Sequence, residues 1–202
     1  MKHNIIFDYG NVLVHFDPHD LCAAVLQNET DIALVKDVLF DRASGDRLDA
    51  GTISDEEVVA RSLERIPERL HDAARRIYAE WYRNTPYIEG LDALVSRLKA
   101  EGRGLYLLSN ISKGFAAHRH EAPHVEALLS KFDGLVLSGT IGIVKPNAEI
   151  FRYLLDTYHL DASDCVFVDD ARRNIAGARN VGIEAYLFDG DAAALDKYLH
   201  NT

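Results

Sequence analysis

Short apolar runs recur along the chain and predict the strands of a β-sheet. Segments with apolar residues three and four positions apart separate the later runs, and this is the spacing of one helix face. Strands that alternate with helices favour crossover connections and a mostly parallel sheet. The pattern therefore predicts an α/β fold with a Rossmann-like parallel sheet. The five predicted strands lie at residues 4–8, 104–108, 134–138, 165–168 and 184–188.

The stretch 17–85 interrupts this alternation because it contains no convincing strand. Asp17-Pro18 is typical of a helix start, with a capping acid before a proline at the first helical position. Thr30 is a candidate cap for a second helix, and Ser54 opens a capping-box sequence for a third. With a further start after Pro67, we expect about four helices in this stretch.

These patterns divide the chain into two predicted domains. Residues 1–15 and 86–202 form the α/β core, and residues 16–85, called the helical segment below, form an inserted helical domain. A chain of 202 residues is long enough for one α/β domain with a sizeable hydrophobic core and an insertion of this kind.

The charge balance is acidic, because 22 Lys and Arg residues face 32 Asp and Glu residues for a net charge of −10. An acidic surface disfavours non-specific binding to nucleic acid and to anionic membranes. No basic stretch precedes a long apolar run, so we expect neither a signal peptide nor a membrane span, and the default location is cytoplasmic. Two distant cysteines do not indicate a disulfide framework. No pattern in the sequence sets the oligomeric state.

Carboxylates end two of the apolar runs. Asp8 closes the first run, and Asp169-Asp170 follow the run at 165–168. Buried carboxylates are costly unless they meet a cation or a reacting group. In doubly wound sheets, ligands bind beyond the carboxyl ends of the strands. We therefore expect the two acidic ends to meet and hold a divalent metal, with one carboxylate free to react.

Two further motifs lie between these acids in the chain. Ser109-Asn110 follow the second apolar run, and Lys145-Pro146 precede a helical stripe. With these motifs in order between Asp8 and Asp169-Asp170, the chain resembles the haloacid dehalogenase (HAD) superfamily of phosphohydrolases over essentially its whole length. The resemblance implies a HAD-like α/β core of strand order 3-2-1-4-5, with the helical segment as an inserted cap domain.

Two stretches look similar to one subgroup of that superfamily. Residues 7–13 (FDYGNVL) and 168–175 (VDDARRNI) resemble the bacterial α-D-glucose-1-phosphate phosphatases. The resemblance implies a Mg²⁺-dependent phosphatase that hydrolyses a small phosphorylated metabolite. A sugar phosphate such as glucose 1-phosphate is the favoured substrate.

The resemblance also implies a nucleophile and a metal site. Asp8 is the expected nucleophile, because a carboxylate can attack phosphorus and form an aspartyl-phosphate. Asp8, the Gly10 backbone carbonyl and Asp170 are the implied Mg²⁺ ligands, and Asp169 binds the ion directly or through water. In the alternative structural reading, one acid of the pair only caps the following helix. A cap explains one acid and not two adjacent ones, so the metal reading is preferred.

Three polar residues are expected around the phosphate itself. Lys145 is expected to act in catalysis by placing its charge against the phosphate and Asp8. Ser109 and Asn110 donate hydrogen bonds to phosphate oxygens at the start of the next helix. Each residue also has a structural reading, because Ser and Asn are common helix caps and a lysine beside a proline is more often a solvated surface residue.

One position departs from the superfamily. Most of its phosphatases carry a second aspartate two residues after the nucleophile as general acid and base, and here that residue is Gly10. General acid–base catalysis contributes ~10²–10⁴-fold, whereas the acceleration of phosphate-monoester hydrolysis approaches ~10²¹-fold. Positioning, metal and electrostatics therefore carry most of the catalysis. A glycosyl phosphate has a better leaving group than an alkyl phosphate and needs this acid less. His15 and Asp17 are candidate replacements.

Two other functions stay open. A metal-independent 2-haloacid dehalogenase also lacks the second aspartate and uses the same nucleophile on carbon, but the acidic pair Asp169-Asp170 argues against it. A degenerate protein that only binds a phosphorylated ligand or a partner protein is disfavoured, because Asp8, Lys145 and both acids of the pair are retained.

Overall fold

The structure is a computed structural model that describes residues 2–201. Five parallel strands form one sheet of order β3-β2-β1-β4-β5. Each strand overlaps a predicted apolar run, and the order is the one implied by the resemblance, so the predicted α/β fold is confirmed. The strands are β1 (Asn4–Phe7), β2 (Gly104–Ser109), β3 (Gly134–Leu137), β4 (Cys165–Asp169) and β5 (Glu184–Leu187).

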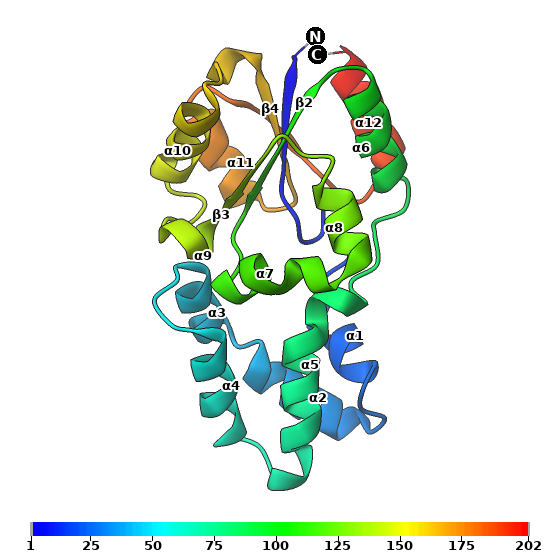
Figure 1. The fold of residues 1–202 in the computed structure, drawn as a ribbon, viewed down its shortest axis with the longest axis vertical. Helices are drawn as coiled ribbons and strands as arrows, with labels where there is room; N and C mark the ends of the chain where they lie inside the picture. Colours follow the sequence, from blue (N-terminus) through cyan, green and yellow to red (C-terminus); the bar gives the residue numbers. More distant parts are fainter. Residues whose placement is uncertain (1, 202) are drawn as a thin grey trace.

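Helices cover both faces of the sheet (Figure 1). On one face lie α6 (Leu91–Ala100) and α12 (Ala192–Asn201), and on the other lie α10 (Ala148–Tyr158) and α11 (Arg172–Arg179). Successive side chains of a strand point to opposite faces. In β1, Ile5 and Phe7 accordingly join the apolar cluster under α6 and α12, whereas Ile6 joins the cluster under α10 and α11. This two-sided burial explains the continuous apolar runs of the central strands.

Shorter helices follow the carboxyl ends of β2 and β3. They are α7 (Lys113–His118), the 3₁₀ turn η3 (Arg119–Glu121), α8 (Pro123–Leu129) and α9 (Ser138–Ile141), and a further 3₁₀ turn, η4 (Ala162–Asp164), precedes β4. The sequence predicts a helix start at Ser109-Asn110, and this is wrong. Helix α7 begins at Lys113, because the Ser112 side chain accepts the hydrogen bond from the Phe115 N–H and caps it.

The helical segment lies beyond the carboxyl ends of the strands (Figure 1). Its cluster of buried apolar side chains comes from its own helices and their connections, and it is separate from the two clusters of the sheet. The division into a core domain and a cap domain stays a prediction. The elements are α1 (Pro18–Ala23), α2 (Glu29–Leu39), α3 (Arg42–Asp49), α4 (Asp55–Leu63), η1 (Glu68–Leu70), α5 (His71–Glu80) and η2 (Trp81–Asn84).

Two of the predicted helix starts in this segment are confirmed and one is wrong. Asp17 caps α1, and Ser54 forms a complete capping box with Glu57 at the start of α4. Helix α2 is capped by Asn28 rather than Thr30, because the Asn28 side chain accepts hydrogen bonds from the N–H groups of Thr30 and Asp31. The predicted set also lacks α3, which buries none of its residues and therefore has no apolar stripe.

Within residues 2–201, no helix combines the length and the apolar character that a crossing of a lipid bilayer requires.

Candidate active site

The parallel pairing of β1 and β4 brings the predicted acids together. Phe7 is opposite Val168 in the ladder, and the Asp8 N–H donates to the Val168 carbonyl at 2.9 Å. Asp8 and Asp169 therefore leave neighbouring strands at the same edge of the sheet. Each of Asp8, Asp169 and Asp170 has a carboxylate oxygen within 4.8 Å of the others. This donor set, made of hard oxygen atoms only, is the kind that Mg²⁺ prefers.

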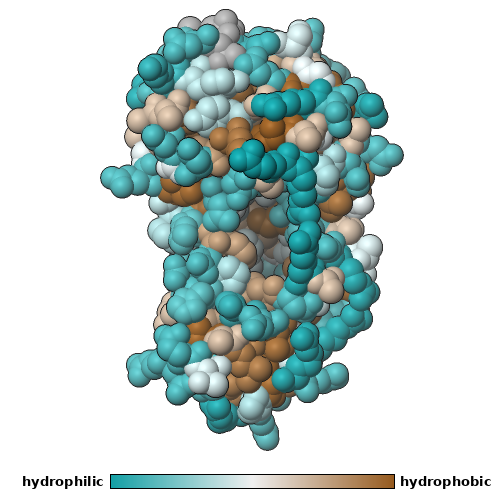
Figure 2. Space-filling view, turned by 180° about the vertical axis from the view of Figure 1, so that it is seen from behind, coloured by the Kyte–Doolittle hydropathy of each residue, from teal (hydrophilic) through white to brown (hydrophobic). Residues whose placement is uncertain are grey.

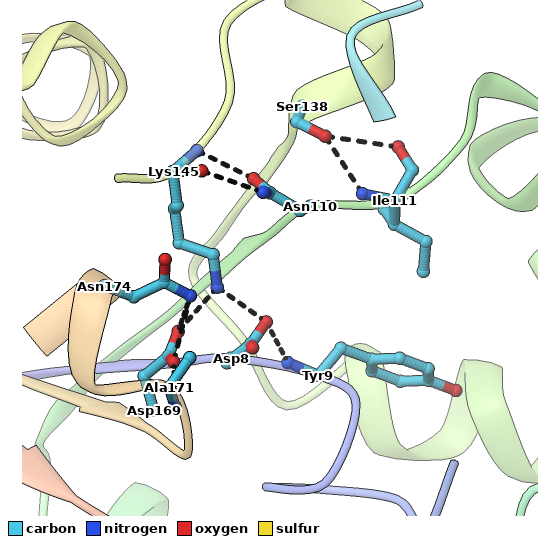
Figure 3. Close-up of polar contacts among 9 residues, drawn as sticks. All are labelled: Asp8, Tyr9, Asn110, Ile111, Ser138, Lys145, Asp169, Ala171 and Asn174. Atoms are coloured by element: carbon cyan, nitrogen blue, oxygen red, sulfur yellow. Dashed lines mark hydrogen bonds and ion pairs between the residues drawn. The ribbon is translucent and has the colours of Figure 1, made fainter. Parts of the chain in front are cut away.

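Lys145 lies between two of these carboxylates. Its Nζ is 2.8 Å from Asp8 Oδ1 and 2.8 Å from Asp169 Oδ2 (Figure 3), and its side chain is only 1% exposed. Burial opposes the charged ammonium, but the charges of Asp8 and Asp169 outweigh it and raise the pKa of Lys145. Lys145 therefore remains a buried cation and not a surface residue.

Asp169 is fully buried, and its carboxylate is held from several sides. The Asn174 amide donates to both of its oxygens at 3.0 Å, and the Ala171 N–H donates to Oδ1 at 2.8 Å. Burial, followed by the charge of Asp8, raises the pKa of Asp169 to about 6, while Lys145 opposes the shift. Burial and Asp8 also raise the pKa of Asp170. Three carboxylates facing one ammonium leave an excess of negative charge, which a divalent cation would offset.

The Asp8 carboxylate has two differently placed oxygens. Lys145 Nζ and the Tyr9 N–H, at 2.8 Å, both bind Oδ1. Oδ2 has no hydrogen-bond partner within residues 2–201. The arrangement fixes the carboxylate through one oxygen and leaves the other available to react.

The turn after Asp8 carries the Gly10 position. The φ angle of Gly10 lies outside the left-handed range, and a Cβ placed there would meet only the Cβ of Phe16, at 3.7 Å. Space therefore does not exclude a side chain at this position. The next residue, Asn11, has a left-handed backbone with φ 56°, and a hydrogen bond from its side chain lowers the pKa of Asp170, against the larger effects of burial and Asp8. Sequence reasoning did not single out Asn11, although it stands beside Gly10 in the same motif.

Ser109 and Asn110 reach the site at the end of β2. Ser109 is buried at the end of the strand. The Asn110 side chain accepts a hydrogen bond from the Lys145 N–H at 2.8 Å and donates one to the Lys145 carbonyl at 3.0 Å (Figure 3). Both polar atoms of this amide are thus bound to the backbone of Lys145. Asn110 connects two of the predicted motifs, and it does not cap α7.

A cavity of about 280 Å³ adjoins these residues. Tyr9, Gly10, Ser109 and Asn110 line it from the sheet, and aromatic and acidic side chains line it from the helical segment. The space-filling view shows the surface hollowed at the waist of the molecule, between the sheet and the helical segment (Figure 2). The cavity therefore joins the predicted site to the helical segment.

Two acids of the helical segment contact or face the core, and sequence reasoning missed both. Asp55, the first residue of α4, accepts hydrogen bonds from Ser112 Oγ and the Gly114 N–H, each at 3.0 Å. Asp49, the last residue of α3, lines the cavity. By contrast, His15 and Asp17, the expected replacement acids, do not line it: His15 is 3.4 Å from Asp20, and Asp17 caps α1.

Curated relatives include phosphatases. A sesquiterpene phosphatase, astK, from Aspergillus oryzae is 28% identical over 107 residues, which are 52% of this chain and 53% of the relative. A D-ribitol-5-phosphate phosphatase from Bacteroides thetaiotaomicron is 25% identical over 191 residues, with 92% and 91% covered. The first three curated matches cover only between 12% and 53% of the relatives' own length.

Solved structures share the fold. A HAD family enzyme from Bacteroides thetaiotaomicron, in complex with magnesium and inorganic phosphate, superposes with a TM-score of 0.68. The sequence identity is 18%, and the match covers 96% of this chain and 99% of the other. The helical segment and the sheet therefore occur together in another protein of this architecture.

A sequence profile of one protein family also matches most of this chain. The sequence profile described as haloacid dehalogenase-like hydrolase matches residues 3–182, which include all four predicted motifs and the helical segment. The strand order and the acidic ends of β1 and β4 agree with that assignment. This chain belongs to the haloacid dehalogenase-like hydrolases.

Proposed function

We propose that this chain is a Mg²⁺-dependent phosphatase that hydrolyses a small phosphorylated metabolite through an aspartyl-phosphate on Asp8. The observation that carries the proposal is the buried Lys145 ammonium between Asp8 and Asp169, with Asp170 beside them at the carboxyl edge of the sheet. The phosphatases among the curated relatives support the same reaction class.

Asp8 Oδ2 is the attacking atom in this mechanism. It forms a bond to phosphorus while the bond between phosphorus and the leaving oxygen breaks, and the leaving oxygen takes a proton. Water then attacks phosphorus, the bond to Asp8 breaks, and inorganic phosphate leaves. Lys145 and the Tyr9 N–H hold Oδ1 throughout, so the carboxylate is oriented before the substrate arrives.

Mg²⁺ would be held by carboxylate oxygens of Asp8 and Asp170, the Gly10 carbonyl and Asp169, directly or through water. When bound, the ion neutralises the phosphate dianion, so that a carboxylate can approach it. The excess of negative charge around Lys145 supports this role, and so does the magnesium and phosphate complex of the structural neighbour.

The other motif residues position charge. Lys145 holds Asp8 and offers its ammonium to the phosphate. Asn110 fixes the backbone of Lys145, so we assign it a positioning role in addition to the phosphate contact expected from the sequence. Ser109 keeps its expected place as a phosphate ligand at the end of β2.

The helical segment acts as a cap that excludes water and selects the substrate. Its side of the cavity combines aromatic rings, Phe40 and Trp81, with carboxylates, Asp46 and Asp49. Aromatic faces pack against the C–H surface of a sugar, and carboxylates accept hydrogen bonds from its hydroxyls. A volume of about 280 Å³ suits one small metabolite. These features support a sugar phosphate, such as glucose 1-phosphate.

The test is a screen of phosphate release with Mg²⁺ across sugar phosphates, alkyl phosphates and a sesquiterpene phosphate, with a 2-haloacid alongside. We expect phosphate release from at least one small phosphate ester, and its loss in EDTA and in Asp8→Asn. Phosphate release that survives both changes would overturn the mechanism. Metal-independent halide release without phosphatase activity would identify a dehalogenase instead.

A further inference from the structure

The proposed reaction needs an acid and a base that position 10 does not supply. The leaving oxygen must receive a proton in the first step, and the attacking water must lose one in the second. Gly10 has no side chain, although a Cβ would fit there. His15 and Asp17 stand outside the cavity lining. A group for both proton transfers must therefore come from another wall of the cavity.

Asp49 lies in the part of the cavity wall that the helical segment forms. It is the last residue of α3 and lines the same cavity as Gly10, Ser109 and Asn110. Its carboxylate has no hydrogen-bond or ion-pair partner within residues 2–201. The nearby Asp46, by contrast, pairs with Arg42 at 3.8 Å. Asp49 is thus half-buried on the cap side of the cavity, and its carboxylate is free to bind a substrate atom.

Charged groups on α3 itself and around the sheet edge act on Asp49. Burial, then the carboxylates of Asp46 and Asp8, raises its pKa to about 6, while the cations of Lys145 and Arg173 oppose the shift. The charge of Asp49 in turn contributes to the raised pKa of Tyr78 on α5, after burial and Asp55. A carboxyl group with a pKa near neutrality can both donate and accept a proton at working pH.

We propose that Asp49 is the general acid and base of this enzyme, in place of the residue missing at position 10. The inference rests on the proposed phosphatase function. In the first step, the bond from Asp8 Oδ2 to phosphorus forms, the bond to the leaving oxygen breaks, and the Asp49 proton passes to that oxygen. In the second step, Asp49 takes a proton from water as the water attacks phosphorus and the bond to Asp8 breaks, which restores the starting state.

Asp49→Asn separates this role from simple binding when two kinds of substrate are compared in one preparation. Glucose 6-phosphate has an alkoxide leaving group that needs a proton, whereas the nitrophenolate of p-nitrophenyl phosphate leaves without one. We expect kcat/KM to fall ~10²-fold or more for glucose 6-phosphate and less than ~10-fold for p-nitrophenyl phosphate. The ratio of the two kcat/KM values does not depend on the fraction of the protein that is folded.

The second step gives a further readout. Without a base for water, the aspartyl-phosphate should accumulate, so p-nitrophenyl phosphate should give a rapid release of one nitrophenolate per active site before slow turnover. Asp72→Asn removes an exposed carboxylate of α5 that does not line the cavity, and it should change neither the substrate ratio nor the time course. An equal loss on both substrates with no burst would overturn the proposal.

A rescue variant and a control for the function complete the test. Gly10→Asp in the Asp49→Asn background should recover glucose 6-phosphate hydrolysis relative to Asp49→Asn alone. If wild-type protein releases phosphate and Asp8→Asn does not, an equal loss in Asp49→Asn rejects only the role of Asp49. If wild-type protein hydrolyses no phosphate ester, the proposed function itself fails.

Discussion

The carboxyl edge of the sheet and helix α3 face the same cavity but are built in opposite ways. At the sheet edge, Lys145 and Asp169 are buried and each has several hydrogen-bond or ion-pair partners. On α3, no residue is buried and Asp49 has no partner within residues 2–201. The sheet edge holds its charges in one geometry, whereas α3 offers a carboxylate that is not held by other side chains. Attack on phosphorus needs the first property, and proton transfer to different leaving groups needs the second.

The strongest test of this contrast is Lys145→Met. It leaves Asp8 and Asp169 without their shared cation, and removal of one partner from a buried ion pair costs about 3–5 kcal/mol. We expect the free energy of unfolding in EDTA, from urea titration, to fall by about that amount, and kcat to fall by ~10²–10³-fold or more.

Lys99→Met is the matched control for that variant. Lys99 pairs with Asp133 on the surface, and an exposed pair contributes about 0–1 kcal/mol. Similar losses of stability in the two lysine variants would show that the sheet edge has no special dependence on its cation.

A smaller effect is expected at Asn174, which supports the same edge from α11. Asn174→Ala removes the donor to both Asp169 oxygens. Loss of a hydrogen bond to a charged group should lower the free energy of unfolding by about 1.5–3 kcal/mol. Mg²⁺ affinity, followed by calorimetry, should weaken ~10–100-fold, as is typical when a residue that orients a metal ligand is lost. Asn180→Ala, at the exposed residue that follows the same helix, should change both by little. Unchanged Mg²⁺ affinity in Asn174→Ala would contradict the assigned role.

The smallest expected effect concerns stability at Asp49 and has the opposite sign. The pKa of Asp49 is raised in the folded state to about 6, from an ordinary value of 3.8. The folded protein therefore binds this proton more tightly than the unfolded chain, and this group destabilises the fold as pH rises from about 4 to about 6. Asp49→Asn should raise the free energy of unfolding by about 1 kcal/mol at pH 7–8, after allowance for solvent screening, and leave it unchanged at pH 4.

Urea titrations of wild type and Asp49→Asn at both pH values, without metal, provide the measurement. The comparison of one variant across pH cancels the carboxylates that shift in the other direction, such as Asp41 and Asp133. If Asp49→Asn raises the free energy of unfolding as much at pH 4 as at pH 7, the ionised carboxylate of Asp49 does not destabilise the folded protein.

The strands of the sheet were predictable from the sequence because each one is marked by a short run of neighbouring residues. Each buried strand is a short apolar run, and the carboxylates at two strand ends stand out against those runs. The strand order and the role of the helical segment came from the resemblance carried by the motifs. Convergence of Asp8 with Asp169-Asp170 then follows from parallel pairing of β1 with β4.

The missed features depend on contacts that no local pattern encodes. Helix α3 escaped prediction because it is held without buried apolar residues. The residue type of Asn110 suggests a helix cap or a phosphate ligand. Only the fold brings it to the Lys145 backbone, 35 positions away. Sequence reasoning gave no site role to Asp49 or Asp55, and their relation to the site arises only when the helical segment is placed on the sheet.

Asp55 links the starts of two helices, one in the helical segment and one that follows β2. It is the first residue of α4, while its carboxylate binds Ser112 and the N–H of Gly114 at the start of α7. Separation of the two halves of the molecule would therefore remove an acceptor from the first turn of α7, directly after Ser109 and Asn110 in the chain. We expect opening of the cavity to loosen the segment that carries Ser109 and Asn110.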